Sequence, residues 1–309
     1  MSAVPSVPRG TRDFESERIL AGIGLVLLAT ACFATLDTST KLSTVAVPVI
    51  MGVWFRYVFQ AVAMAAVLLP RHGMAVLRTA HPKYQILRGA LLLVSSSLAF
   101  LSLRYMPMAE FTAIVLVVPL VVTLLAATQL KEQVSPLRWG LVAGGFAGTL
   151  IILRPGGDAF SWATLLPLGL VVTNAWFQVL TSKLAQTENP LTMNFYSGWV
   201  GALIASIALP FAWTALPSWH WWALLCLMGF MGTVGHFILI LAFQRAPAST
   251  LTPYLYAQIG FAMLGGWLVF SRVPDAVSLV GIGLIAVCGA AGAWLTVKER
   301  RLPIEPAES

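Results

Sequence analysis

Charged side chains are scarce in this sequence. Only 10% of its 309 residues are charged and 58% are hydrophobic, whereas a typical soluble domain carries roughly 25% charged residues. A soluble globule of this size must cover its surface with polar groups, so the composition excludes a soluble fold. The net charge of +7 would suggest nucleic acid in a soluble protein. Here the basic residues lie in short loops between apolar runs, and we expect no nucleic-acid partner.

Residues that could build a metal or catalytic centre are also few. Three cysteines, Cys32, Cys226 and Cys288, lie inside apolar runs without metal-type spacing, and the four histidines are scattered. The sequence has no Gly-x-x-x-x-Gly-Lys-Ser/Thr phosphate loop, no His-Glu-x-x-His and no Gly-x-Ser-x-Gly. We therefore predict that the protein is not an enzyme and has no cofactor and no metal site.

Long apolar runs account for most of the chain. A membrane-spanning helix needs about 20 mostly apolar residues. Ten such runs can be marked, at residues 19–42, 47–69, 84–103, 108–129, 136–154, 162–183, 191–213, 219–243, 248–270 and 275–297. Because backbone polar groups in lipid must be satisfied within their own segment, each run is predicted to be a helix. The predicted fold class is an all-α integral membrane protein with ten transmembrane helices.

Lysine and arginine are distributed unevenly between alternate loops. With the N terminus in the cytoplasm, 14 of them fall on the cytoplasmic side, among them Arg88 at the start of the third run. Only four fall outside, and Arg56 lies within a run. This asymmetry predicts a multi-pass protein of a bacterial inner membrane with both termini in the cytoplasm.

The two halves of the sequence resemble each other. The motif at residues 103–109 recurs at residues 242–248 with a shift of one residue, so that Pro107 corresponds to Pro247, 140 residues later. Five helices per half is an odd number, so the second half must insert in the opposite orientation to the first. Inverted repeats are the architecture of many secondary transporters. The predicted domains are a cytoplasmic segment 1–18, a first five-helix repeat 19–154, a second repeat 161–297 and a cytoplasmic tail 298–309.

Several motifs resemble the ten-helix EamA-type branch of the drug/metabolite transporter superfamily. They are Leu103-Arg104-Tyr105-Met106-Pro107, Val118-Pro119-Leu120, Leu130-Lys131-Glu132, Arg138-Trp139-Gly140, Gly145 to Gly148, Phe55-Arg56-Tyr57 and Lys41. The resemblance covers roughly residues 19–297, and amino-acid exporters are one subgroup to which the chain is similar. It implies efflux of amino acids or other metabolites. The chain departs from the family where Ser271-Arg272 replaces a Gly-Glu-type turn.

Uncharged polar and aromatic residues occur at membrane depth in four of the runs. Such groups cost free energy in lipid and usually face the bundle interior or a wet cavity. Interhelical hydrogen bonding would explain each of them singly, but together they favour a substrate cavity. The predicted substrate-binding residues are Asn174, Trp176, Gln178, Tyr254, Gln258, Ser96, Thr233 and His236.

Three ionisable residues are candidates for ion or charge coupling. Arg56, about one third of the way into the second run, either binds a substrate carboxylate, or snorkels outward or holds a helix end. Asp37 and Lys41 lie four residues apart, a spacing that favours an ion pair on a helix. Asp37 is a candidate proton or substrate carrier, but a structural pair with Lys41 near the outer surface is the favoured interpretation.

These features predict a secondary transporter that exports small metabolites by alternating access, with amino acids, aromatic or hydrophobic ones in particular, as substrates. The predicted partners are a small-molecule substrate and the lipid bilayer, and the predicted assembly is a monomer or a weak dimer. Two alternatives stay open. One is a multidrug or lipophilic-cation exporter of the same fold, and the other is a membrane-embedded enzyme of lipid chemistry.

Overall fold

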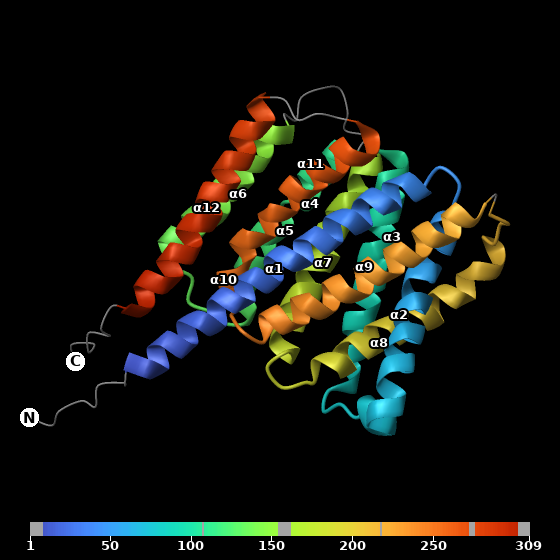
Figure 1. Cartoon of the computed structure of the whole chain (residues 1–309), viewed down its shortest axis with the longest axis horizontal. Coiled ribbons are helices and arrows are strands. Elements are labelled where there is room, and N and C mark those ends of the chain that lie inside the picture. The colour runs from blue at the N-terminus through green and yellow to red at the C-terminus, as the bar shows by residue number, and fades with distance from the viewer. Residues whose placement is uncertain (1–8, 107, 154–161, 217, 272–275, 302–309) are drawn as a thin grey trace, which may run out of the picture.

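The computed structural model describes residues 9–106, 108–153, 162–216, 218–271 and 276–301 (Figure 1). All regular elements in these ranges are helices, which confirms the all-α prediction. The α-helices are α1 (Arg9–Ser43), α2 (Val49–His72), α3 (Pro82–Tyr105), α4 (Met108–Val115), α5 (Val118–Gln129), α6 (Pro136–Leu153), α7 (Leu165–Leu184), α8 (Pro190–Ala208), α9 (Trp219–Phe243), α10 (Ala248–Leu251), α11 (Ala257–Phe270) and α12 (Ala276–Arg301). Short 3-10 helices are η1 (Gly73–Leu77), η2 (Trp162–Thr164), η3 (Leu209–Phe211) and η4 (Thr252–Tyr256).

The ten predicted spans correspond to these helices. Six segments within the described ranges are long and apolar enough to cross a membrane: Glu17–Ser43, Val49–Arg71, Pro82–Tyr105, Trp162–Leu184, Pro190–Phe211 and Trp219–Phe243. The other four predicted spans coincide with α4 and α5 together, α6, the α10–η4–α11 segment, and α12. The chain is therefore a multi-pass membrane protein with the predicted ten-helix architecture.

Two of the ten spans are broken near their middle, although each run was predicted to be a single helix. The fourth span breaks between α4 and α5, and the ninth breaks where the 3-10 helix η4 replaces regular α-helix. Pro119 lies in the first turn of α5, and Pro253 lies in η4. A proline has no N–H to donate and its ring clashes with the carbonyl four residues earlier, so each proline interrupts the helical ladder.

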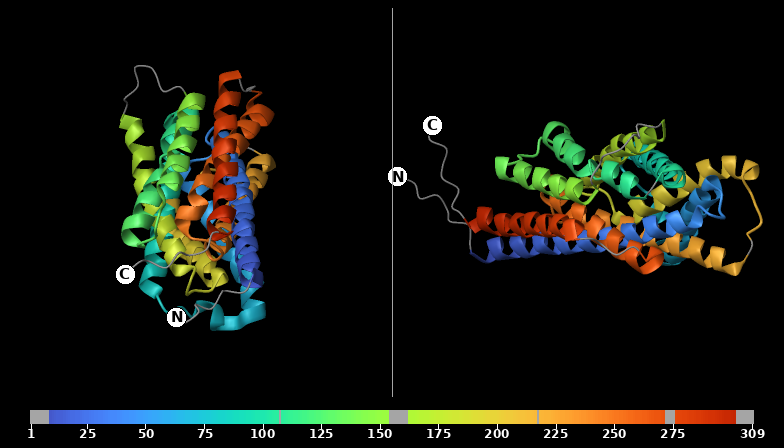
Figure 2. Two further views of the ribbon diagram at one scale, coloured as in Figure 1. Left: turned by 90° about the vertical axis from the view of Figure 1, so that its left-hand side faces the viewer. Right: turned by 90° about the horizontal axis from the view of Figure 1, so that it is seen from above.

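The start of α1 and the end of α12 lie at the same end of the bundle, and the two helices lie side by side there (Figures 1 and 2). We call this end the termini face. It also carries η1, the α7–α8 connection and the α9–α10 connection. The opposite end, with the α1–α2 and α8–α9 connections, is the far face.

The helix contacts have the symmetry of an inverted repeat. Helix α3 packs against α7 and α8, and its counterpart α9 packs against α1 and α2. Helix α2 packs against α8, and α6 against α12. Exchanging the first half for the second maps each contact onto another, which places a pseudo-two-fold axis between α2 and α8 and between α6 and α12.

Backbone details repeat at the same interval of 140 residues. Lys131 after α5 and Ser271 after α11 both have a positive φ, of 55° and 53°. Gly89 and Gly229 both allow a close approach of helices, because an added Cβ would lie 2.8 Å from Val200 or 2.5 Å from Phe59. The predicted inverted repeat is thus confirmed.

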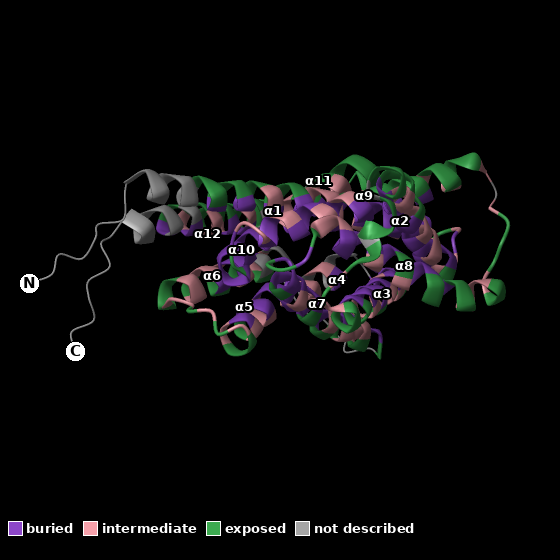
Figure 3. Cartoon of the chain, turned by 90° about the horizontal axis from the view of Figure 1, so that it is seen from below, coloured by how far each residue is buried: buried purple, intermediate pink, exposed green. Residues whose placement is uncertain are grey.

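Buried residues follow the inside of the bundle, and much of the outer surface is exposed (Figure 3). The exposed side chains include many large apolar ones, such as Leu28, Val62, Leu203, Ile207, Phe230 and Leu268. An apolar outer surface on helices that satisfy their own backbone groups is what lipid requires.

Candidate substrate cavity

A cavity of about 140 Å³ lies between the two halves. Side chains of α1, α2, α3, α4, α5, α7, α9, η4 and α11 line it. Its polar lining consists of Asp37, Thr40, Arg56, Ser95, Ser96, Thr112, Asn174, Gln178, His236 and Gln258, and its aromatic lining of Phe33, Phe100, Phe111 and Phe177. Seven of the predicted site residues are therefore brought together: Arg56, Asp37, Ser96, Asn174, Gln178, His236 and Gln258.

The cavity is built symmetrically from both repeats. On α1 the lining residues Phe33, Leu36 and Asp37 precede their counterparts on α7, Asn174, Phe177 and Gln178, by 141 residues. The breaks in the fourth and ninth spans flank the cavity at positions 140 residues apart, where Val118 corresponds to Gln258. The cavity therefore lies on the pseudo-two-fold axis, where alternating-access transporters place their substrate.

Arg56 is the only arginine in this lining, and it is 3% exposed. Its guanidinium donates hydrogen bonds to the hydroxyls of Ser96 and, at 3.3 Å, of Tyr57. Its Nε has no hydrogen-bond partner, and no carboxylate forms an ion pair with it in the part of the chain that the structure describes. Gly232 on α9 allows this position, because a Cβ there would lie 2.7 Å from the Arg56 Nε.

Among the residues that the structure describes, Asp37 is the only acidic one in the lining, and it contacts the ninth span. Its Oδ2 accepts a hydrogen bond of 2.8 Å from the Gln258 side-chain amide, just beyond the break between η4 and α11. Arg56 and Asp37 form no ion pair with each other. The cavity therefore offers one cationic and one anionic group from different helices.

Two amides add neutral polar groups on α7. The Gln178 side-chain N–H donates to the Asn174 side-chain oxygen at 2.7 Å. The Gln178 side-chain oxygen is buried and accepts no hydrogen bond from any residue that the structure describes. It can therefore accept a hydrogen bond from a bound molecule.

His236 lies between two aromatic rings on the α9 side of the cavity. Its ring centre is 4.8 Å from that of Phe33 and 5.7 Å from that of Phe177. Its Nδ1 lies 2.8 Å from the Gly232 carbonyl oxygen. When Nδ1 donates this hydrogen bond, Nε2 is left as the acceptor.

Four predicted site residues lie outside the cavity lining. Trp176 is 42% exposed on the outer surface of α7, because it follows Asn174 by only two residues and so points to the opposite side of the helix. Tyr254 packs toward α12, where a Cβ at Gly292 would lie 3.2 Å from its hydroxyl. The remaining two, Thr233 and Lys41, make other contacts.

The Thr233 hydroxyl donates to the Gly229 carbonyl in its own helix at 2.7 Å, and the Thr233 carbonyl accepts from Asn194 at 3.3 Å. Lys41 donates to the carbonyls of Leu103, at 2.7 Å, and Met106 at the far-face end of α3. Asp37 and Lys41 thus have different hydrogen-bond partners in the structure. Asp37 accepts from Gln258 and Lys41 donates to α3, whereas their spacing in the sequence favoured an ion pair between the two.

The sequence analysis missed two kinds of residue. Phe33 and Phe177 are cavity aromatics hidden among many apolar residues. Arg88 was counted with the loop charges, but it is completely buried on α3. Its position five residues inside the third apolar run, three after Gln85, was the available signal.

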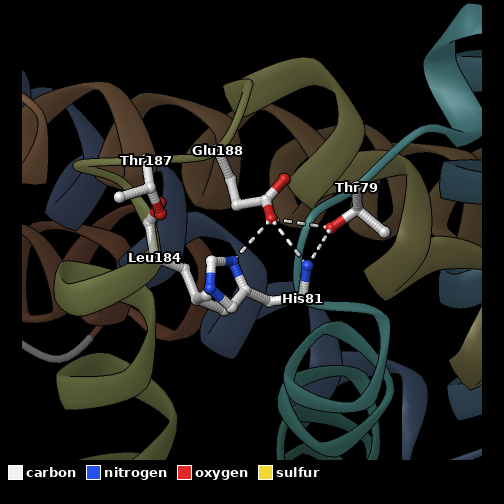
Figure 4. A network of polar contacts seen from close by, with 5 residues as sticks. All are labelled: Thr79, His81, Leu184, Thr187 and Glu188. Atoms are coloured by element: carbon white, nitrogen blue, oxygen red, sulfur yellow. Dashed lines mark hydrogen bonds and ion pairs between the residues drawn. The ribbon is translucent and has the colours of Figure 1, made fainter.

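The termini face is closed by contacts between the two halves. Thr79 and His81, from the α2–α3 connection, meet Glu188 of the α7–α8 connection (Figure 4). The Glu188 carboxylate accepts from the Thr79 hydroxyl at 2.8 Å and lies 3.1 Å from both the backbone nitrogen and Nδ1 of His81. Burial raises the pKa of Glu188, but the hydrogen bonds from Thr79 and His81 outweigh it and hold the pKa below its usual value.

A second contact between the halves uses Glu132 in the resembling Leu130-Lys131-Glu132 motif. Its carboxylate accepts from the backbone nitrogens of Ala248, at 3.3 Å, and Ser249, at 2.9 Å, at the start of α10. A carboxylate that accepts free backbone N–H groups stabilises a helix start. Its counterpart in the second repeat, Arg272, lies outside the described residues.

Comparisons with known proteins agree with this architecture. The model of the EamA-like transporter family matches residues 20–154 and again residues 161–295. A solved crystal structure with 22% sequence identity superimposes with a TM-score of 0.74 and covers 92% of this chain and 98% of its own. That likeness concerns the fold.

Two curated relatives match nearly end to end. A riboflavin transporter of Rhizobium johnstonii is 29% identical, over 95% of this chain and 96% of the relative. An S-adenosylmethionine uptake transporter of Rickettsia felis is 28% identical, over 86% of this chain and 90% of the relative. Both are named as small-molecule transporters, and neither name denotes an enzyme. With both halves matched, the chain belongs to the EamA-like transporter family of the drug/metabolite transporter superfamily and is a membrane transporter of small molecules.

Proposed function

We propose that this chain is a secondary transporter of small zwitterionic metabolites, amino acids above all, and that it works by alternating access. One observation carries the proposal: the guanidinium of Arg56, which has no ion pair within the described residues, and the carboxylate of Asp37 line the same cavity. Arg56 would bind the carboxylate of the substrate by charge-assisted hydrogen bonds. Asp37, oriented by Gln258, would bind its ammonium group.

The remaining lining suits the body of an amino acid with an aromatic or apolar side chain. Phe33 and Phe177 offer flat apolar surfaces, which stack on rings and attract cations. The free Gln178 oxygen supplies an acceptor that orients the molecule. A lipophilic cation fits this cavity less well, because the Arg56 charge opposes it.

Alternating access is supported by the two broken spans and by the contacts at the termini face. Transport requires the cavity to open to each side in turn, and the repeat supplies two related packings of the same helices. The contacts of Glu188 and Glu132 between the halves would break when the cavity opens to the termini face. Asp37 is the proposed coupling group, since it is the acid that a proton and a substrate ammonium can both neutralise.

The proposal includes the orientation and direction expected from the sequence. Both termini would lie in the cytoplasm of a bacterial inner membrane, with the repeats at 19–154 and 161–297 and short cytoplasmic segments on either side. The proposed direction is export. The Rickettsia relative is named as an uptake transporter, so the direction of transport has to be measured for this chain. That the protein is a monomer or a weak dimer stays a prediction.

Purified protein in liposomes, loaded with one unlabelled compound and assayed for uptake of its radiolabelled form, tests the proposal. The panel contains aromatic, aliphatic and charged amino acids, riboflavin, S-adenosylmethionine and tetraphenylphosphonium. We expect exchange of aromatic and aliphatic amino acids. Exchange of the phosphonium cation without any amino acid would contradict the proposal.

Single substitutions test the site. Arg56→Gln should weaken amino-acid binding on the order of 10- to 100-fold, as expected for the loss of a hydrogen bond to a charged group, and Gln178→Ala should weaken it less. Arg78→Gln, at an exposed position between η1 and α3, and Tyr254→Phe, outside the lining, are the controls. Equal transport by Arg56→Gln and the controls would remove Arg56 from the site.

A further inference from the structure

A second arginine is buried outside the cavity. Arg88 on α3 is completely buried, and it heads the largest fully buried side chains. Its guanidinium donates to the carbonyl of Met193 and to the hydroxyl of Ser197 at 2.8 Å, both on α8, and contacts the Thr181 hydroxyl on α7 at 3.5 Å. All three acceptors are uncharged, and within the described residues no carboxylate forms an ion pair with Arg88.

This environment leaves polar groups unsatisfied. Within the part of the chain that the structure describes, the Nε of Arg88 has no hydrogen-bond partner, and neither does the oxygen or the nitrogen of the Gln85 side-chain amide, one turn away on the same helix. Gln85 is also completely buried. Burying a charge without a counter-ion strongly destabilises a fold, and burying an amide without hydrogen-bond partners also destabilises it. A bound carboxylate would neutralise the Arg88 charge and accept a hydrogen bond from the Gln85 side-chain N–H, which would offset the first effect and part of the second.

One aromatic ring separates Arg88 from the cavity. Phe177 lines the cavity, and its ring centre lies 5.6 Å from the Arg88 guanidinium carbon. On α3, Leu92 also lines the cavity, one turn from Arg88. Arg88 is therefore next to the cavity, behind an apolar barrier formed by these two side chains.

The position along α3 places Arg88 toward the termini face. Ser96, which binds Arg56, follows Arg88 by eight residues, or about 12 Å along the helix axis. Beyond Gln85, α3 begins at Pro82, next to the His81 and Glu188 contact that closes this face. A molecule that leaves the cavity along α3 toward the termini face meets Arg88 next.

We propose that Gln85, Arg88, Thr181 and Ser197 form a second binding site, for a carboxylate, which the substrate reaches from Arg56 when the Phe177 ring moves aside. The inference rests on the proposed function, because it assigns this second site to the same carboxylate. The carboxylate of the substrate would then bind in two successive steps, first at Arg56 and next at Arg88. The second site has no equivalent in the other half of the protein, because the counterparts of Gln85 and Arg88 on α9 are Leu225 and Met228, both buried and apolar.

Charge-selective thiol labelling tests the second site without a transported solute. Ser197→Cys is made in a chain whose three native cysteines are replaced by alanine. Its modification in liposomes is timed with the anionic 2-sulfonatoethyl methanethiosulfonate and the cationic 2-(trimethylammonio)ethyl analogue, each relative to its rate with a free thiol. We expect the anionic reagent to be favoured by about tenfold, since a buried cation concentrates anions nearby.

Variants at Arg88 decide the cause of this preference. Arg88→Gln should abolish it, and Arg88→Lys, which keeps the charge, should retain it. Should Arg88→Gln fail to fold, Gln85→Glu provides the same test, because a carboxylate one turn away neutralises Arg88. Met228→Cys, at the counterpart of Arg88 on α9, is the matched control and should show no preference for the anion.

Three results would overturn the inference: no labelling of the cysteine at position 197 by either reagent, a preference that survives both Arg88→Gln and Gln85→Glu, or the same preference at position 228. The labelling is measured without amino acids. Charge-selective labelling together with failure of all amino acids in the exchange panel would therefore refute the proposed substrate class and leave the anion site in place.

Discussion

Helix α3 meets α7 and α8 in one part of the bundle, and α9 meets α1 and α2 in the part related to it by the pseudo-two-fold axis. The backbones approach in the same way, through Gly89 in one interface and Gly229 in the other. The side chains differ: Gln85 and Arg88 in the first are replaced by Leu225 and Met228 in the second, all fully or almost fully buried. Glycines thus preserve the packing geometry in both halves, while the polarity of the buried side chains differs between them.

The cavity shows the same contrast on a smaller scale. Asp37 on α1 has Gln178 as its counterpart on α7, and both line the cavity. In the proposed function, backbone symmetry provides the two packings needed for alternating access, and the unequal side chains would orient the substrate and make one half of the path more polar than the other. Each prediction below makes the two halves more alike or less alike.

Met228→Arg should have the largest effect. It places a guanidinium in the buried hydrophobic cluster that Met228 forms with Leu225 and Met51. An unpaired buried charge destabilises by about 3–5 kcal/mol, so little folded protein is expected. Fluorescence-detected size-exclusion chromatography in detergent measures this, with Met228→Leu as the control. A monodisperse Met228→Arg protein of normal abundance would contradict the prediction, because it would show that water reaches the interface of α9 around residue 228.

Arg88→Met makes α3 resemble α9. Replacing a buried charge by an apolar side chain of similar volume is often neutral or stabilising by about 1–4 kcal/mol, so the unfolding temperature should be unchanged or higher. Transport of a carboxylate-bearing substrate should fall on the order of 100-fold, because the second step of the path loses its cation. A stable variant with normal exchange rates would assign Arg88 to structure alone.

Asp37→Gln gives both halves an amide at this cavity position. The affinity for an amine-bearing substrate should fall on the order of tenfold, the value of one charge-assisted contact. The pH dependence of exchange that comes from this carboxyl should also disappear. Thr35→Gln, on an exposed face of α1, is the control, and a pH profile of Asp37→Gln identical to that of the unaltered protein would exclude Asp37 as the coupling group.

The smallest effect is expected at Glu188. Its pKa is held below the usual value in the folded protein, so its contribution to stability is present above the pKa of the unfolded chain and is lost as pH falls through the lower, folded pKa. Unfolding temperatures measured from pH 7 to pH 3 should drop in the acid range, and Glu188→Gln should reduce this drop slightly. An identical pH profile in Glu188→Gln would remove this contact from the closure of the termini face.

The sequence predicted the ten spans and the inverted repeat because lipid imposes strong rules on length and polarity. Polar groups at mid-depth, such as Gln178, Gln258 and His236, were predicted to face the interior for the same reason, and the structure places them in the cavity lining. Trp176 lies on the outer surface because, two residues after Asn174, it points to the opposite side of the helix. The spacing in the sequence was sufficient to predict this.

Other features could not be read from spacing. Tyr254 and Gln258 were both predicted to bind substrate, but the 3-10 helix η4 changes the number of residues per turn between them and directs Tyr254 toward α12. Arg88 was counted as a loop charge because helix ends are uncertain by a few residues in sequence. Its burial depends on the contact of α3 with α7 and α8, which only the tertiary structure supplies.

Competition among three related molecules tests the central claim most directly. Exchange of radiolabelled L-phenylalanine in liposomes is measured in the presence of unlabelled L-phenylalanine, 2-phenylethylamine, which lacks the carboxylate, or 3-phenylpropionate, which lacks the amine. If Arg56 and Asp37 bind opposite ends of one molecule, L-phenylalanine competes on the order of tenfold better than either analogue. Competition by 2-phenylethylamine equal to that of L-phenylalanine would contradict the account.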